Sequence, residues 1–145
     1  LSSRYGASTG PLAQLYVVAH EWGHHIQNLI GQMDNLSRES GPDSDGVRLE
    51  LQADCFAGAW VGAQETTLDE YGVPYLKPIT DQELADALSA AEAVGDDNIQ
   101  ESVTGQVNPE SWTHGSSEQR QKWFERGRTQ GPQSCDTFSI DGSQL

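Results

Sequence analysis

Two histidines and a glutamate form the most chemically specific pattern in the sequence. His20, Glu21 and His24 stand in the order H-E-x-x-H. On a helix this spacing separates the histidines by about 40° around the axis, so both imidazoles can reach one metal ion. Glu21 points about 100° away from His20, which leaves it free to take a proton from a metal-activated water. The pattern predicts a metal-dependent hydrolase; the alternative is two partly buried histidines on an amphipathic helix that binds no metal.

A later acidic pair, Glu50 and Asp54, offers a third metal ligand and a hydrogen-bond partner for a ligating histidine. Catalytic zinc usually has three protein ligands and keeps its fourth position for water. Glu50 and Asp54 form E-x-x-x-D and share one helix face, so Glu50 can complete a His2Glu site. Asp54 can then accept the free ring N–H of a ligating histidine, which sets the tautomer of that ring. We expect one zinc ion per chain, and Cys55 is disfavoured as a rival ligand because it points about 140° away from Glu50.

Helical patterns surround these residues. The spacing of apolar residues predicts a helix over residues 11–30, and a second over 47–65 after a polar loop. Two capping boxes predict further helices, one from about residue 80 to Gly95 and one over 117–128. The second helix carries small residues that let another helix approach closely: Ala53, Ala57, Gly58, Ala59 and Gly62. No convincing alternation of period two marks a strand.

The composition limits the partners of the chain. Its 145 residues, read as one domain over 1–145, carry 22 acidic and 8 basic side chains, a net charge of -14. This charge makes nucleic acid and anionic membrane surfaces unlikely partners. The longest apolar stretch, Leu15 to Ala19, is too short for a membrane span or a signal peptide. Two cysteines, Cys55 and Cys135, are too few for a disulfide framework but could form one bridge.

Four stretches of the sequence resemble the bacterial neutral zinc metallopeptidases of the YpfJ-like family. Residues 19–31 read AHEWGHHIQNLIG and resemble the motif helix of that family, and residues 49–60, LELQADCFAGAW, resemble its third-ligand helix. Its C-terminal part is similar to residues 95–97, GDD, with residues 112–120, WTHGSSEQR, and to the tail QSCDTF at 133–138. The resemblance implies a mainly α, zincin-like peptidase domain, with any β edge largely upstream of this chain.

The resemblance also implies roles and a location. His114 is expected to donate a hydrogen bond to the oxyanion, although a loop histidine near a helix start is an equal alternative. By helix geometry His25 lies about 100° off the ligand face and is expected to pack or to support a ligand. Arg120 could orient His114 or a substrate carboxylate, but an arginine early on a helix is more often at the surface, so it is left out of the site. Family members carry an N-terminal membrane anchor upstream, so we expect an extracytoplasmic bacterial protein that contacts a membrane only through such an anchor. A bridge between Cys55 and Cys135 suits that location.

These patterns together favour one function. We expect a zinc peptidase in which His20, His24 and Glu50 hold the metal and Glu21 acts as general base on a peptide or protein substrate. One alternative is a catalytically silent binding module that zinc stabilises. Another is an interaction domain without metal, whose acidic face recruits a cationic partner.

Overall fold

Four α-helices carry the site and its surroundings. The computed structural model describes residues 10–77, 79–93, 100–101 and 103–145. Its helices are α2 (Pro11–Leu29), α3 (Asp45–Thr66), α4 (Asp81–Ala93) and α6 (Ser117–Gln130), with short 3-10 turns η1 (Pro109–Ser111), η2 (Pro132–Ser134) and η3 (Gly142–Gln144). Within these ranges there is no strand, only an isolated bridge between Leu68 and Pro74. The expectation of a mainly α fold is confirmed.

Local sequence signals set the ends of the two helices that carry the motif. Pro11 is the first residue of α2, where its missing N–H costs nothing, and Gly31 follows the helix with a φ of +73°. The helix expected over residues 47–65 begins two residues earlier, because the Ser44 side chain accepts a hydrogen bond from the backbone N–H of Val47. Both helices therefore lie where the periodicity placed them.

Capping boxes begin the other two helices, as predicted. Thr80 and Glu83 exchange side-chain and backbone hydrogen bonds at the start of α4, and Ser116 and Gln119 do the same at the start of α6. Helix α6 continues two residues beyond the predicted end. The predicted end of the third helix near Gly95, and the GDD stretch with it, lie outside the described residues.

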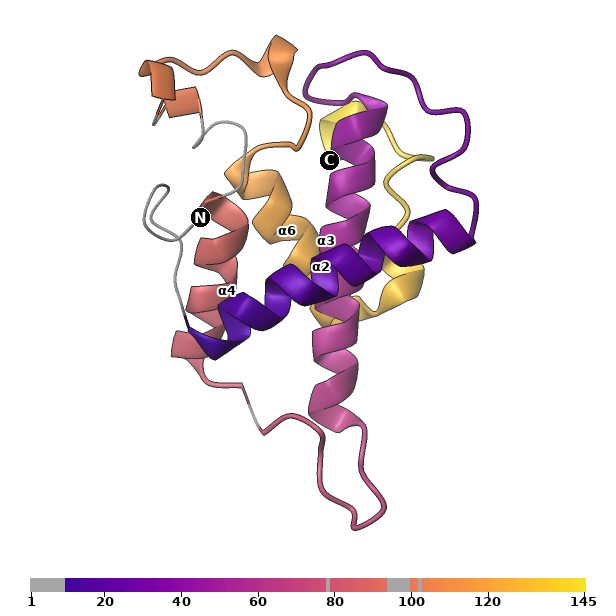
Figure 1. Cartoon of the computed structure of the whole chain (residues 1–145), viewed down its shortest axis with the longest axis vertical. Helices are drawn as coiled ribbons and strands as arrows, with labels where there is room; N and C mark the ends of the chain where they lie inside the picture. The colour runs from indigo at the N-terminus through magenta and orange to yellow at the C-terminus, as the bar shows by residue number, and fades with distance from the viewer. Residues whose placement is uncertain (1–9, 78, 94–99, 102) are drawn as a thin grey trace.

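Helix α3 packs against both α2 and α6, whereas α4 packs against α2 and α6. Figure 1 shows α2 lying across α3, with α6 beside α3 and α4 packed near the start of α2. The predicted close approach is confirmed, and the structure adds which helices make it. A methyl group on Gly58 or Gly62 would overlap the backbone of α6, whereas one on Gly23 of α2 would lie 2.8 Å from the Ala53 carbonyl oxygen of α3. Small residues thus bring two helices against opposite parts of α3.

Two apolar clusters form the core. One joins all four helices and includes Tyr16, Val61 and Phe124, and the other packs the first half of α3 against α6 and the C-terminal tail. The tail is joined to α3 by a disulfide between Cys55 and Cys135. This bond holds the last segment of the chain against the helix that carries Glu50 and Asp54.

No helix in the described part of the chain is long and apolar enough to cross a membrane.

Candidate metal centre

The crossing of α2 over α3 brings three potential ligands together. His20 and His24 come from α2 and Glu50 from α3, and one ligand atom of each lies within 4.8 Å of the other two. His20 is buried, whereas His24 and Glu50 are partly exposed. Gly23 lies between the histidines in sequence and contacts Ala53, so the missing side chain at this position allows the two helices to come this close.

The distances suit a small, approximately tetrahedral metal ion. Nε2 of His20 lies 3.2 Å from Glu50 Oε2, and Nε2 of His24 lies 3.4 Å from Glu50 Oε1. Two ligands about 2 Å from zinc at a tetrahedral angle lie roughly 3.3 Å apart. Two imidazoles and one carboxylate are also the donor set of catalytic zinc sites. The residues present therefore fit a zinc ion.

Asp54 lies beneath this group and is fully buried. Its Oδ1 accepts hydrogen bonds from His20 Nδ1 at 2.8 Å and from the Tyr16 hydroxyl at 2.5 Å. Arg120 of α6 donates to both carboxylate oxygens, at 2.7 Å and 3.1 Å. With Nδ1 of His20 donating to Asp54, Nε2 is the nitrogen that faces Glu50. The hydrogen bond that the sequence suggested between Asp54 and a histidine is present in the structure.

His24 is held differently, by a neutral amide. Its Nδ1 lies 2.8 Å from Oε1 of Gln27, which is fully buried one turn later on α2. Nε2 of Gln27 donates to the Leu49 carbonyl and to Gln52 Oε1 of α3. Each histidine therefore has one ring nitrogen bonded to a buried partner and the other directed at Glu50.

The charges in this cluster stabilise one another. Burial opposes the protonated form of His20, but the Asp54 carboxylate outweighs it and raises the pKa of His20 to about 9. The hydrogen bond to Glu50 raises the pKa of His24 above its usual value. Burial would raise the pKa values of both carboxyls. The histidines beside Glu50 and the Arg120 guanidinium beside Asp54 reverse this and hold both pKa values below their usual range. A metal ion at the two Nε2 atoms would displace protons from the rings.

The other residues with predicted roles lie at the surface. Glu21 is exposed on α2, directly after His20. His114 is exposed, and its Nδ1 lies 2.9 Å from the Thr113 hydroxyl. A methyl group on Gly46 would lie 3.2 Å from the Thr113 carbonyl oxygen, so this segment passes over the first turn of α3, one turn before Glu50. His25 is also exposed, and its ring lies tilted against Trp22 with centroids 4.9 Å apart.

The structure corrects one expectation and adds three residues. Arg120 was expected at the surface, but it is 2 % exposed, and its Nη2 lies 3.6 Å from Glu50 Oε2. The correction follows from burial of Asp54, since a buried carboxylate needs a cation and Arg120 is the one that reaches it. Tyr16, Gln27 and Gln52 also support the cluster. The polar Gln27 within the apolar pattern of α2 was the one signal of this role in the sequence.

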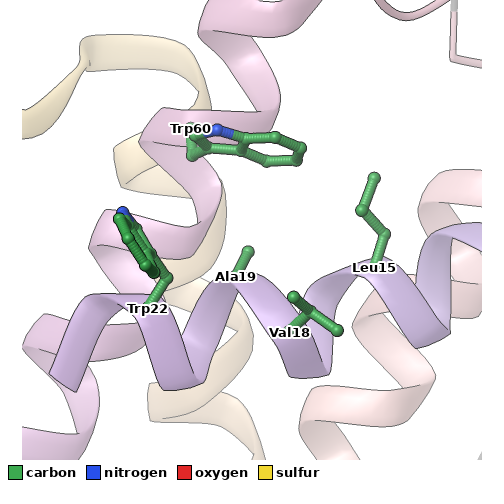
Figure 2. A pocket seen from close by; sticks show the side chains of 5 residues that line it. All are labelled: Leu15, Val18, Ala19, Trp22 and Trp60. Carbon is green, nitrogen blue, oxygen red and sulfur yellow. The ribbon is translucent and has the colours of Figure 1, made fainter. Parts of the chain in front are cut away.

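The apolar groove on α2 is separate from this site. It measures about 180 Å³ and is lined by Leu15, Val18, Ala19, Trp22 and Trp60, as Figure 2 shows. Val18 and Trp22 each stand two positions from His20, which is about 160° around the helix. The groove therefore opens on the face of α2 turned away from the histidine, and its residues do not contribute to the candidate metal centre.

Comparison with known proteins agrees with the chemistry of these residues. Residues 1–138 match the model of the family described as "Putative neutral zinc metallopeptidase". Uncharacterized protein Rv2575 of Mycobacterium tuberculosis (strain ATCC 25618 / H37Rv) is 54% identical over 142 residues, covering 96% of this chain and 48% of that protein. Uncharacterized protein YpfJ of Escherichia coli (strain K12) is 41% identical over 145 residues, covering 95% of this chain and 47% of that protein.

The chain spans about half the length of the curated relatives it matches. No solved structure matches it.

The buried ion pair predicts a large difference between two arginines of α6. Arg120→Met leaves the Asp54 carboxylate buried without its cation, which should lower the free energy of unfolding by about 3 to 5 kcal/mol. Arg128→Met is the matched control, because Arg128 pairs with Glu65 and Glu125 in a more exposed setting and should cost less than about 1 kcal/mol. Urea denaturation without added metal measures both. Equal decreases in the free energy of unfolding would show that the buried Arg120–Asp54 pair stabilises the fold no more than the more exposed pairs of Arg128.

Proposed function

The chain belongs to the neutral zinc metallopeptidase family, and from this we propose that it is a zinc-dependent peptidase that hydrolyses peptide bonds. The observation that carries the proposal is the convergence of both histidine Nε2 atoms on the Glu50 carboxylate, with the other nitrogen of each ring held by a buried partner. Zinc ligands in enzymes are held in this way, because the partner fixes the tautomer and the orientation of the ring.

His20, His24 and Glu50 would hold the metal. When bound, zinc supplies a Lewis acid that polarises a scissile carbonyl and lowers the pKa of a water molecule toward neutrality. Asp54 and Gln27 hold Nδ1 of the two rings, which would leave both Nε2 atoms to bind the metal. Arg120 compensates the Asp54 charge, which lets that carboxylate stay ionised while it accepts the ring proton of His20.

Glu21 would move the proton in the reaction. It is adjacent to His20 but points to a different side of α2, so its carboxylate is not part of the ligand group. It would accept a proton from the attacking water and transfer it to the nitrogen of the departing amine. Its exposure lets it reach water without a rearrangement of the helix.

His114 would stabilise the negative charge that develops on the carbonyl oxygen. It is exposed on a segment that passes over the first turn of α3, so it can approach a substrate beside Glu50. Its Nδ1 lies beside the Thr113 hydroxyl of the same segment. A donor placed at the developing oxyanion is worth more in the transition state than in the ground state.

The disulfide supports an extracytoplasmic location, because such bonds persist in oxidising compartments. A peptide or protein is the proposed substrate, and the charge of -14 argues against nucleic acid.

Metal content tests the ligand assignment. The purified chain should contain one zinc per molecule by elemental analysis, and His20→Ala, His24→Ala and Glu50→Ala should each lose most of it. His25→Ala is the matched control, because this exposed histidine is next to His24 but lies against Trp22, outside the group. Zinc that persists without Glu50 would assign the third ligand elsewhere.

The role of Glu21 predicts a separation of binding from turnover. Glu21→Gln should keep the zinc and abolish peptide cleavage, because the amide cannot take the proton from water. Glu70→Gln, an exposed change in the loop after α3, should leave cleavage unchanged. Mass spectrometry of a peptide mixture incubated with each zinc-loaded variant measures this. A zinc-loaded chain in which neither wild type nor Glu70→Gln cleaves any peptide would favour the alternative, a binding module stabilised by zinc.

Removal of His114 should lower the rate without removing the metal. If it donates to the oxyanion, His114→Ala should reduce kcat on the order of 10²-fold to 10³-fold. Steady-state kinetics on a peptide cleaved by the wild type, together with zinc content, measure the effect. A reduction of kcat below about tenfold would contradict the oxyanion role and favour the alternative, a structural role for His114 in the loop.

A further inference from the structure

The two proposed histidine ligands differ in the residue that is hydrogen-bonded to Nδ1 of the ring. His20 is bonded to a carboxylate whose charge Arg120 neutralises, whereas His24 is bonded to the uncharged side chain of Gln27. A single amide could turn in either direction, so a further contact must set which end faces His24. That contact lies on α3 and in the tail that follows α6.

The hydrogen bonds of Gln27 leave one orientation. Its Nε2 donates to the Leu49 carbonyl at 2.7 Å and to Gln52 Oε1 at 3.0 Å, which uses both N–H groups of the amide. Only Oε1 remains for His24, and an acceptor there requires that Nδ1 of the ring carry the proton. Nε2 of His24 is directed at Glu50, and it is then the nitrogen whose lone pair a metal ion would take once the proton on it is displaced.

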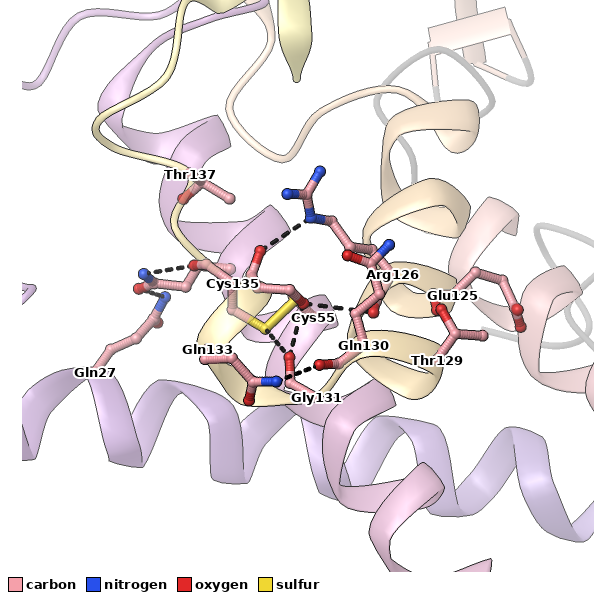
Figure 3. The surroundings of a disulfide bond; sticks show 12 residues. Gln27, Cys55, Glu125, Arg126, Thr129, Gln130, Gly131, Gln133, Cys135 and Thr137 are labelled. Atoms are coloured by element: carbon pink, nitrogen blue, oxygen red, sulfur yellow. Dashed lines mark hydrogen bonds between the residues drawn. A yellow bond between two sulfur atoms is a disulfide. The ribbon is translucent and has the colours of Figure 1, made fainter.

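Gln52 is fixed in turn by the C-terminal tail. Its Nε2 donates to the Cys135 carbonyl at 3.0 Å, so its Oε1 is the end left for Gln27. Gln27 is fully buried and Gln52 is 5 % exposed, so water does not compete freely for these groups. Cys135 is bonded to Cys55, less than one turn after Gln52 on α3. Figure 3 shows Gln27 reaching from α2 toward this disulfide.

We propose that Gln27 and Gln52 form a relay through which the disulfide-anchored tail positions His24 for metal binding. The relay runs from the Cys135 carbonyl through both amides to Nδ1 of His24. The orientation of each amide sets that of the next group, because an amide whose N–H groups donate on one side presents its oxygen as an acceptor on the other. Gln27 and Gln52 are positioning residues, which act through the ring of His24. This inference rests on the proposed metal site.

Zinc affinity and a cobalt spectrum test the relay. Gln27→Leu preserves the approximate size of the side chain but removes its acceptor, and it should raise the zinc dissociation constant about 10-fold to 100-fold. Competition with a chromogenic chelator measures this constant. With cobalt as probe, the visible absorption bands should change in position or intensity, because the ring of His24 is no longer fixed. Gln52→Leu should change both readouts in the same direction and by less.

A matched variant separates positioning from general stability. Gln121 of α6 donates to the Leu88 carbonyl at 3.0 Å, so Gln121→Leu also removes a partly buried bond from an amide to a carbonyl, away from the relay. It should lower the urea midpoint of the metal-free chain while leaving zinc affinity and the cobalt spectrum at wild-type values.

The disulfide is tested by a double variant. Cys55→Ala combined with Cys135→Ala should weaken zinc binding in the same direction as Gln52→Leu, since the tail that carries the Cys135 carbonyl is released. If Gln27→Leu does not fold, Gln52→Leu and the double cysteine variant carry the test. Wild-type zinc affinity and cobalt bands in the folded relay variants would overturn the relay. A wild-type chain that binds no zinc would instead overturn the metal site itself.

Discussion

The buried charge of Asp54 governs how the helices around the candidate site pack. A carboxylate with no exposure to solvent is tolerated only when cations and hydrogen-bond donors surround it. Here the donors are Tyr16 and His20 of α2 and Arg120 of α6, while Asp54 itself belongs to α3. One charge thereby fixes the relative positions of three helices. It also turns the ring of His20 toward Glu50.

This arrangement gives the two histidines unequal support. His20 lies in a charged network, and its raised pKa reflects the nearby Asp54 carboxylate. His24 is more exposed and depends on two neutral glutamines whose orientation is set by the tail. A charged partner increases the basicity of a ligating ring more than a neutral amide does. The site therefore combines one strongly held ring with one whose geometry depends on packing far along the chain.

Small residues at the helix crossings make these bonds possible. Gly23 allows α2 to contact α3 at Ala53, and Gly58 and Gly62 allow α6 to contact the same helix further along. Short polar side chains such as Asp54 reach a neighbouring helix only when the backbones are this close. The disulfide then fastens the tail to α3 beside the place where Gln52 needs its acceptor.

The helices and the nearest groups of the candidate site could be predicted from local sequence patterns. H-E-x-x-H and E-x-x-x-D are local patterns, so helical periodicity alone places His20 with His24 and Glu50 with Asp54 on common faces. The capping boxes at Thr80 and Ser116 are equally local. The roles of Arg120, Gln52 and the Cys135 carbonyl could be seen only once the helices and the tail were packed together. Their partners lie 66 and 83 residues away along the chain, and no local pattern encodes a contact that forms only when the helices and the tail pack together.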